Sequence, residues 1–287
     1  MKKTKSIQRT AINNFSGKLF LVIKVLYKKF FIKSTDEQKV IFIVGCQRSG
    51  KTLIVNLFGK DLNSRIYGET SSLTLKGSQR LRLKPYDEVQ HAIQRVKIPL
   101  IVLESLVESQ NILTLLRHFR DSKAIWLFRH YKDVAQSNLE RFGINNGIKD
   151  LRSIVEMNPR NWRSEKVSNN TRNIILNFFS ENMDPYDAAA LFWFVRNMIF
   201  FENKLERNQS VIMCNYEELV IKPVEMMAKI YKFIDFKFPG GRIVSDVYQT
   251  SIGKGQNLIL SAEVEKLCND LYQRLYEVYK NQPFLKI

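Results

Sequence analysis

VIFIVGCQRSGKTLIVNL, residues 40–57, is the stretch that decides the fold of this chain. Its first five residues are apolar, which is typical of a buried β-strand, and Gly45 and Gly50 then mark a turn. Apolar side chains after the turn repeat at the spacing of an amphipathic helix. A glycine-rich turn between a strand and a helix binds anionic oxygens through backbone N–H groups and the helix N-terminus. The stretch therefore predicts an α/β protein with a parallel central sheet that binds a phosphate-like anion.

The same turn matches the pattern G-x-x-x-x-G-K-[ST] through Gly45, Gly50, Lys51 and Thr52. This pattern is typical of kinases and NTPases that bind Mg-ATP. The turn also contains Arg48 and Ser49, a cation and a hydroxyl that can contact an anion of another kind. The loop alone therefore leaves two alternatives, a P-loop kinase or NTPase that uses Mg-ATP at residues 45–52 and an enzyme for a different anion.

The composition indicates one folded domain with a basic arm. The chain has 287 residues, of which 45% are hydrophobic, enough to bury a single core. Its formal net charge of +17 and its pI near 9.7 favour an anionic partner. The three cysteines, Cys46, Cys214 and Cys268, lack the spacing of a metal site and indicate a reducing compartment. We therefore expect a cytoplasmic protein.

Residues 1–39 form the basic arm, with ten basic residues against two acidic ones and a net charge of +8. Between residues 15 and 33, apolar side chains such as Ile23 and Leu26 recur at helical spacing, and lysines such as Lys24 fall largely on the other side. The lysines interrupt the run too early for a transmembrane helix, which needs roughly 20 mostly apolar residues. We expect either a basic amphipathic helix at the inner face of an anionic membrane or a helix packed on the following domain.

Short β-rich runs alternate with helical segments after the arm, which is typical of a parallel sheet flanked by helices. The predicted strands are residues 40–44, 99–103, 124–128 and 211–214. The predicted helices are residues 52–62, 109–119, 133–141, 185–206 and 223–233. Asp184 before Pro185 is a strong helix start, and the helix that follows is apolar nearly all round, so it should be buried. One domain then spans residues 40–287, with residues 151–182 as an insertion or lid.

A second element supports the anion site. KAIWLFRHYKDVAQSNLERF, residues 123–142, predicts a strand that ends at Arg129 and a helix that begins near Asp133. Open α/β sheets bind their ligands at the carboxyl ends of the strands. With Asp133 as N-cap, Ser137 lies one helical turn further and can share an oxyanion with Arg129, whose fork suits a phosphate.

The two elements together resemble the sulfotransferase family, which uses the P-loop NTPase fold to bind 3′-phosphoadenosine 5′-phosphosulfate (PAPS). The resemblance spans about residues 40–280 and rests on four ordered elements. The family's first loop, which grips the 5′-phosphosulfate, stands here as Arg48, Ser49, Gly50, Lys51 and Thr52. Its second element, which binds the 3′-phosphate, stands here as Arg129, Asp133 and Ser137. The third is NYEELVIKPVEMMAKIYKFI, residues 215–234, and the fourth is the nucleotide-contacting turn with Ser251, Gly253 and Lys254.

The resemblance also implies a catalytic base, since an acceptor hydroxyl must lose its proton as the sulfuryl group arrives. Protein-tyrosine sulfotransferases and similar enzymes place a glutamate after the helix that follows the first loop, which corresponds to Glu69 here. His91 is the second candidate. We expect in-line sulfuryl transfer in which Arg48 and Lys51 stabilise the developing charge, with no metal, because a sulfonate bears less charge than a triphosphate.

One residue departs from the family. Many related bacterial sequences carry a lysine at the end of the second predicted strand, where this chain has Glu104. A carboxylate there also suits the Mg-ATP alternative, in which it would act like a Walker-B residue. That alternative leaves Arg129 and Ser137 without a role. A non-enzymatic basic binding protein is a third hypothesis, but it leaves the strand, loop and helix unit unexplained, and no RNA-type aromatic motif indicates nucleic acid.

The acceptor is the least determined partner. The resemblance implies a glycan or glycolipid hydroxyl as the default for bacterial-type members, and a membrane-associated arm suits a lipid-linked acceptor. A small metabolite or a peptide tyrosine stays open, as does the oligomeric state.

Overall fold

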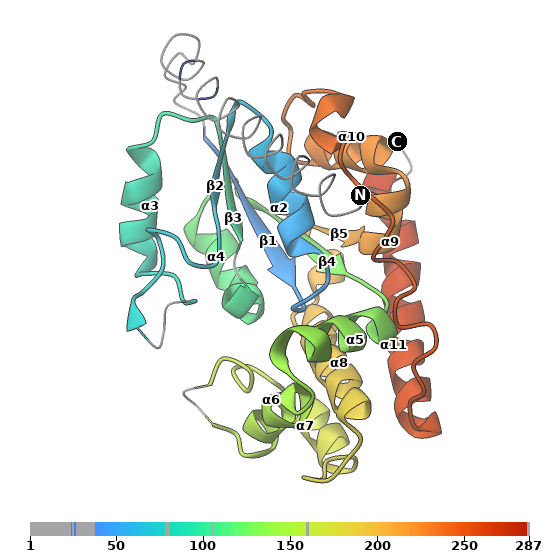
Figure 1. Ribbon diagram of the computed structural model, residues 1–287. Helices are drawn as coiled ribbons and strands as arrows, with labels where there is room; N and C mark the ends of the chain where they lie inside the picture. The colour runs from blue at the N-terminus through green and yellow to red at the C-terminus, as the bar shows by residue number, and fades with distance from the viewer. Residues whose placement is uncertain are drawn as a thin grey trace, which may run out of the picture.

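The computed structural model describes Lys24, Leu26 and residues 38–77, 81–104, 106–158 and 161–285. These residues form an α/β structure around a five-stranded sheet in which every strand pair is parallel (Figure 1). The strand order is β2-β3-β1-β4-β5. The strands are β1 (Lys39–Gly45), β2 (Ser64–Tyr67), β3 (Leu100–Glu104), β4 (Lys123–Phe128) and β5 (Val211–Asn215). The predicted fold class is confirmed.

β2 is the strand that the sequence did not predict. Its four residues, SRIY, show no alternation of polar and apolar side chains, and they are too few to indicate a strand without a partner. Pairing with β3 supplies what the local sequence lacks, since Ser64 aligns with Leu100 and Tyr67 with Leu103. By contrast, β1 is buried along nearly its whole length, as its continuous apolar run predicts for a central parallel strand.

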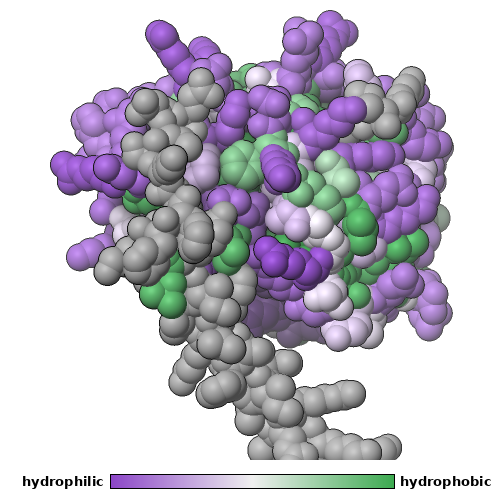
Figure 2. Space-filling view, turned by 90° about the horizontal axis from the view of Figure 1, so that it is seen from above, coloured by the Kyte–Doolittle hydropathy of each residue, from purple (hydrophilic) through white to green (hydrophobic). Residues whose placement is uncertain are grey.

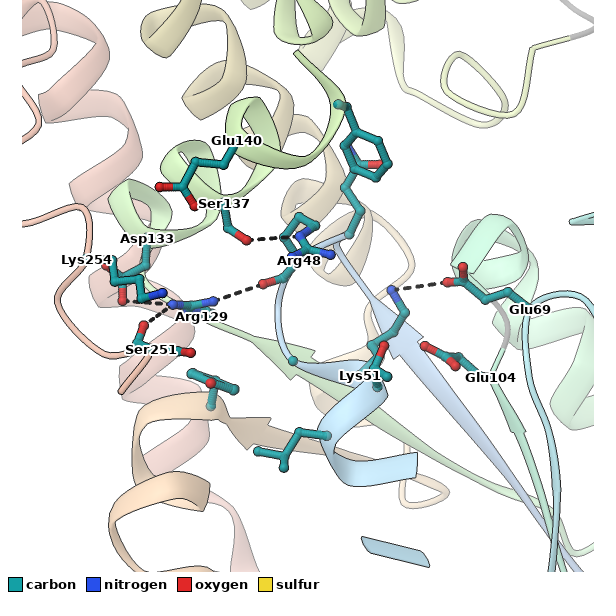
Figure 3. A pocket seen from close by; sticks show the side chains of 16 residues that line it. Arg48, Lys51, Glu69, Glu104, Arg129, Asp133, Ser137, Glu140, Ser251 and Lys254 are labelled. Carbon is teal, nitrogen blue, oxygen red and sulfur yellow. Dashed lines mark hydrogen bonds and ion pairs between the residues drawn. The ribbon is translucent and has the colours of Figure 1, made fainter. Parts of the chain in front are cut away.

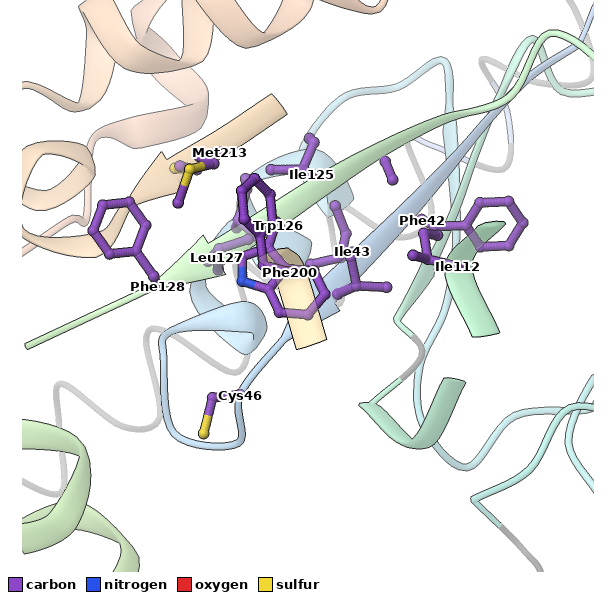
Figure 4. Packing of buried hydrophobic residues seen from close by; sticks show 14 of the residues in the cluster. Phe42, Ile43, Cys46, Ile112, Ile125, Trp126, Leu127, Phe128, Phe200 and Met213 are labelled. Carbon is purple, nitrogen blue, oxygen red and sulfur yellow. The ribbon is translucent and has the colours of Figure 1, made fainter. Parts of the chain in front are cut away.

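The helices flank the sheet on both faces. In Figures 1 and 4, α2 lies on one face and α8 on the other. The α-helices are α2 (Lys51–Gly59), α3 (Tyr86–Gln94), α4 (Ile112–His118), α5 (Tyr131–Phe142), α6 (Asn146–Val155), α7 (Asn169–Leu176), α8 (Pro185–Glu202), α9 (Tyr216–Ile221), α10 (Pro223–Phe233) and α11 (Ala262–Asn281). The 3₁₀ helices are η2 (Leu106–Asn111), η3 (Leu205–Arg207), η4 (Gly241–Val244) and η5 (Pro283–Leu285).

The core is centred on β1, β4 and α8 (Figure 4). The ring of Trp126 on β4 contacts that of Phe200 on α8, with centroids 5.5 Å apart. α8 begins where predicted, because the Asp184 carboxylate accepts hydrogen bonds from the N–H groups of Tyr186 and Asp187. It is buried on nearly all sides, which confirms that part of the prediction. α8 thus packs against β4 in the core.

Two helix predictions are corrected. The predicted helix at residues 109–119 is divided into η2 and α4, because the Ser109 hydroxyl bonds to the backbone N–H and C=O of Gly45 and holds η2 against β1. α5 begins earlier than predicted, with His130 rather than Asp133 as N-cap, and the His130 ring accepts a hydrogen bond from Lys132 N. The Asp133 carboxylate has other partners, described below.

The predicted amphipathic helix of the arm lies outside the described residues, apart from two positions. Lys24 and Leu26 are both helical. Lys24 is buried, and its ammonium donates to the carbonyl of Gly59 at 2.7 Å and to Ser64 Oγ at 3.2 Å. Leu26 is 49% exposed. At these two positions the polar residue contacts the domain and the apolar one is exposed.

One face of the molecule is mainly polar at its surface (Figure 2). Figure 2 shows hydrophilic side chains over most of the coloured face, with apolar ones in small separate patches. Among the described residues, no helix is both long and apolar enough to cross a bilayer.

Candidate active site

A cavity of 340 Å³ opens where the glycine-rich loop (residues 45–52) follows β1 (Figure 3). The ends of β3 and β4 supply Glu104 and Arg129, and Tyr216 follows the end of β5. This is the edge where parallel sheets bind ligands. The lining residues are Gln47, Arg48, Gly50, Lys51, Thr52, Leu53, Glu69, Glu104, Arg129, Asp133, Ser137, Glu140, Phe142, Tyr216, Ser251 and Lys254.

The glycine-rich loop contains backbone angles in the left-handed region, where φ is positive. Gly50 has a φ of 95°, and a Cβ there would lie 2.2 Å from a ring carbon of Tyr216, so only glycine fits. Arg48 also has a positive φ, 65°, although it is not a glycine. A non-glycine residue in this region is held there by its surroundings. The loop is therefore a fixed structure rather than a flexible turn.

One end of the cavity joins a buried lysine to two carboxylates. Lys51 Nζ lies 3.9 Å from Glu69 Oε1, and it donates to the carbonyl of Cys46 at 3.3 Å. Burial lowers the pKa of Lys51, and the nearby charges of Glu69 and Glu104 oppose that shift. Burial raises the pKa of Glu104, whose side chain is hydrogen-bonded to that of Thr52. Glu69 is more accessible, with 33% of its side chain exposed.

The other end of the cavity gathers two arginines and a serine. Arg48 Nε donates to Ser137 Oγ at 3.0 Å, so α5 and the glycine-rich loop meet there. Arg129 is 5% exposed, and its guanidinium lies over the Tyr216 ring, 4.5 Å from the centroid. Arg129 donates through Nη1 to the carbonyl of Arg48 and through Nη2 to the carbonyl of Ser251. Its buried Nε has no hydrogen-bond partner among the described residues. Ser137 thus contacts Arg48, and it lines the same cavity as Arg129, with which the sequence predicted that it shares an oxyanion.

Asp133 ties α5 to the loop at residues 251–255. Its carboxylate accepts hydrogen bonds from Gly253 N at 2.9 Å and Gly255 N at 2.7 Å, and from Arg129 at 3.2 Å. Gly255 lies so close to α5 that a Cβ there would be 2.3 Å from the Lys132 carbonyl. One carboxylate therefore positions both Arg129 and the loop that carries Ser251 and Lys254.

Some predicted site residues face away from the cavity. Ser49 is fully buried, and its hydroxyl donates to the Cys46 carbonyl. The N–H groups of Gly45 and Gly253 already donate to Ser109 and Asp133. These backbone and side-chain groups support the loops rather than line the cavity.

The three histidines also lie outside the cavity lining. His91 is exposed on α3. His118 packs against Phe119 at the end of α4, and His130 caps α5 and stacks on Tyr131. Of the two candidate bases, only Glu69 lines the cavity that holds Arg48 and Lys51.

Other lining residues were missed by the sequence analysis. Tyr216 directly follows β5, so the strand-end rule that selected Arg129 would also have selected it. Gln47, Glu140 and Phe142 had no comparable signal, because only the approach of the loop to α5 brings them to the cavity.

Within the described ranges, no group of three or more His, Cys, Asp or Glu side chains is arranged to hold a metal ion. The cavity lining contains four carboxylates and four cations.

A family model described as the sulfotransferase domain matches residues 38–263, which include the glycine-rich loop, α5 and the 251–255 loop. The chain belongs to the sulfotransferase family. It is therefore a sulfotransferase of the class that takes its sulfuryl group from PAPS. No curated protein sequence matches the chain significantly.

Two solved sulfotransferase domains are similar in fold. The domain from the Synechococcus PCC 7002 olefin synthase is 15% identical, with a TM-score of 0.51 over 85% of this chain and 98% of that one. The sulfotransferase domain from the curacin biosynthetic pathway is 16% identical, with a TM-score of 0.53 over 84% of this chain and 99% of that one. At these identities the likeness concerns the fold.

Proposed function

We propose that this sulfotransferase moves the sulfuryl group of PAPS to an acceptor hydroxyl at the cavity between Lys51 and Arg129. The observation that carries the proposal is the presence of two cationic regions in one cavity, one at the glycine-rich loop and one at the end of β4. PAPS has two separated anionic groups, a 5′-phosphosulfate and a 3′-phosphate, and supplies an activated sulfuryl group. A nucleoside triphosphate has no anion at the 3′ position.

The residues at the end of β4 fit a 3′-phosphate. The buried Arg129 Nε has no partner in the described structure, and Arg48 and Ser137 lie beside it. A buried guanidinium nitrogen without an acceptor is costly, and an anionic oxygen would satisfy it. Lys254, on the loop that Asp133 holds, adds a further cation at the cavity.

Lys51, Arg48 and Glu69 suit the chemistry at the other end. The Lys51 ammonium would meet the negative charge that develops on the transferred group and on the leaving oxygen. Glu69, which is partly exposed, would accept the proton of the acceptor hydroxyl. Loss of a preorganised donor of this kind typically costs about 2.7–4 kcal/mol of barrier.

For the acceptor we propose a carbohydrate or glycolipid hydroxyl, which the family resemblance implies. The basic arm would place the enzyme at an anionic membrane surface, where lipid-linked acceptors lie. A radiolabelled PAPS assay with glycan, glycolipid and phenolic acceptors tests this part. Transfer only to phenols would contradict it.

Binding of the donor is tested by calorimetry with adenosine 3′,5′-bisphosphate, the nucleotide product, without metal, beside ATP with and without Mg²⁺. The variants are Arg129→Ala and Ser137→Ala. The first removes a guanidinium from the proposed 3′-phosphate site, and the second removes only a hydroxyl. The matched control is Arg152→Ala, an arginine 44% exposed that pairs with Glu181 on the surface.

We expect metal-independent binding of the bisphosphate that Arg129→Ala reduces at least tenfold, that Ser137→Ala reduces less, and that Arg152→Ala leaves unchanged. Preference for Mg-ATP, untouched by Arg129→Ala, would overturn the proposal and favour the kinase or NTPase alternative with Glu104 near the metal.

A further inference from the structure

We propose that Asp150 is a positioning residue, which fixes the glycine-rich loop through Gln47 and joins that loop to the segment at residues 161–167. This inference rests on the proposed donor site at the loop. It assigns a role to a buried carboxylate that contacts neither the cavity nor the proposed catalytic groups.

Asp150 is a junction between three segments. It is 1% exposed on α6, 103 residues from Gln47 in the sequence. Its Oδ2 accepts hydrogen bonds from Gln47 Nε2 at 3.1 Å and from Asn146 Nδ2 at 2.9 Å. Its Oδ1 accepts one from Arg163 Nε. A buried carboxylate with several donors is strongly held, so each donor is held by it in turn.

The helix that carries Asp150 cannot shift easily. Gly147 lies one turn earlier on α6, against the start of α8. A Cβ at Gly147 would be 2.5 Å from the backbone nitrogen of Ala189, so the two helices are in backbone contact. α8 belongs to the buried core. Asp150 is thus fixed to a rigid element, as a residue that positions a functional loop requires.

Gln47 lies at the part of the loop whose conformation needs to be held in place. It lines the cavity and precedes Arg48, which has a positive φ. A non-glycine residue in that conformation persists only where its neighbours hold it. The side chains of Gln47 and Arg48 are each held by a hydrogen bond, Gln47 to Asp150 and Arg48 to Ser137. Loss of the hydrogen bond between Gln47 and Asp150 lets the loop move away from the geometry that the donor site requires.

Arg163 extends the connection to the segment that the sequence analysis named an insertion or lid. Its guanidinium lies over the Trp162 ring, 4.7 Å from the centroid, and the Trp162 carbonyl accepts a hydrogen bond from Gln110. Movement of this segment therefore changes the partners of Asp150. The state of residues 161–167 should consequently affect the affinity of the donor site.

The experiment has two arms, both on the full chain. The first measures backbone amide hydrogen exchange of peptides that cover residues 45–52 without nucleotide, in the parent, Asp150→Asn and Arg163→Ala. The second measures adenosine 3′,5′-bisphosphate affinity in a cycle of Gln47→Ala, Asp150→Asn and the double variant. Glu156→Gln, an exposed acid at the end of α6, is the matched control.

We expect exchange at residues 45–52 to be about fivefold faster in Asp150→Asn, as for the loss of one hydrogen bond worth ~1 kcal/mol. We expect a smaller increase in Arg163→Ala and none in Glu156→Gln. Each single variant of the cycle should bind the bisphosphate about 5- to 10-fold more weakly, and the double variant no more weakly than Gln47→Ala.

Unchanged exchange in Asp150→Asn would overturn the inference, and so would fold-changes that multiply in the double variant. If the parent binds no bisphosphate, the proposed donor site is wrong, while the exchange arm still decides the role of Asp150. A melting curve for each variant distinguishes a change confined to the conformation of residues 45–52 from unfolding of the whole domain.

Discussion

Lys51 Nζ and Glu69 Oε1 lie 3.9 Å apart at one end of the cavity, one group buried and the other partly exposed. In the proposed function, Lys51 meets the charged donor and Glu69 is the residue that the acceptor reaches. Glu69 follows the short strand β2 by two residues, so its place depends on the pairing of β2 with β3. The proposal therefore assigns charge stabilisation to the loop and proton acceptance to a carboxylate from a different part of the sheet.

Replacement of Glu69 by Gln should lower kcat by about 10²–10⁴-fold, because the amide cannot accept the acceptor proton. Bisphosphate affinity should change little, since the proposed function places the donor's anions at the arginines and at Lys51. Initial rates with PAPS measure the first effect and calorimetry the second.

The companion variant is His91→Ala, which should keep the parent rate because His91 is exposed on α3, away from the cavity lining. Glu88→Gln, an exposed glutamate on the same helix, is the charge control. If turnover were lost in His91→Ala and kept in Glu69→Gln, His91 would be the base and Glu69 would not.

The pH dependence of turnover should report on Lys51. Burial lowers the pKa of its ammonium from the ordinary 10.5, so the cation is lost at a lower pH than for an exposed lysine. The basic limb of the kcat/KM profile should therefore begin below pH 10.5. Lys51→Arg should be slower at neutral pH, since a larger group must fit a buried site, and its basic limb should move to higher pH. If the parent and Lys51→Arg showed the basic limb at the same pH, the limb would belong to the titration of another group.

Glu104→Gln should stabilise the protein at neutral pH. Burial raises the pKa of this carboxyl, so the folded state holds its proton more tightly than the unfolded chain does. The free energy of unfolding then falls as the pH rises from the ordinary carboxyl pKa to the raised one, and the loss is complete above it. A glutamine, which can keep a hydrogen bond to Thr52, removes this loss.

Melting temperatures at about pH 4 and pH 7 test the prediction. The variant should exceed the parent at pH 7, with a smaller difference at pH 4. It should also bind the bisphosphate more tightly, because one negative charge leaves the cavity wall. A variant less stable than the parent at pH 7 would show that Lys51 needs Glu104 as a partner.

The stability of the fold also depends on a buried hydrogen bond between α10 and the turn after α2. Tyr231 Oη donates to Asp61 Oδ2 at 2.9 Å, and both residues are almost fully buried. Tyr231→Phe leaves that carboxylate without this donor, which should lower the free energy of unfolding by about 1–3 kcal/mol. Urea unfolding measures the change. Tyr248→Phe, at a residue that is 71% exposed, should have no effect.

The sequence predicted those parts of the fold that local pattern determines. β1, α8 and α10 lie close to where the apolar runs and start signals placed them, since a continuous apolar strand and a capped, buried helix need no distant partner to be recognised. β2 was missed because its stability depends on β3.

The cavity lining was predicted in part for the same reason. Arg48, Lys51, Arg129 and Ser137 line one cavity, and each was a candidate because strand ends and a glycine-rich loop indicate where an anion binds. The role of Asp133 was misassigned, because a carboxylate in the first turn of a helix is typical of a cap, whereas here the amides of Gly253 and Gly255 bind it. No local pattern reveals a contact between residues more than 100 positions apart.

The backbone contact between Gly147 and Ala189 gives a way to look for the Asp150 junction in other chains. A single methyl group at position 147 would push α6 outward, and the carboxylate one turn later would leave Gln47. Glycine, aspartate and glutamine at positions equivalent to 147, 150 and 47 should therefore occur together, and a relative with a larger residue at 147 should hold its first loop by other means.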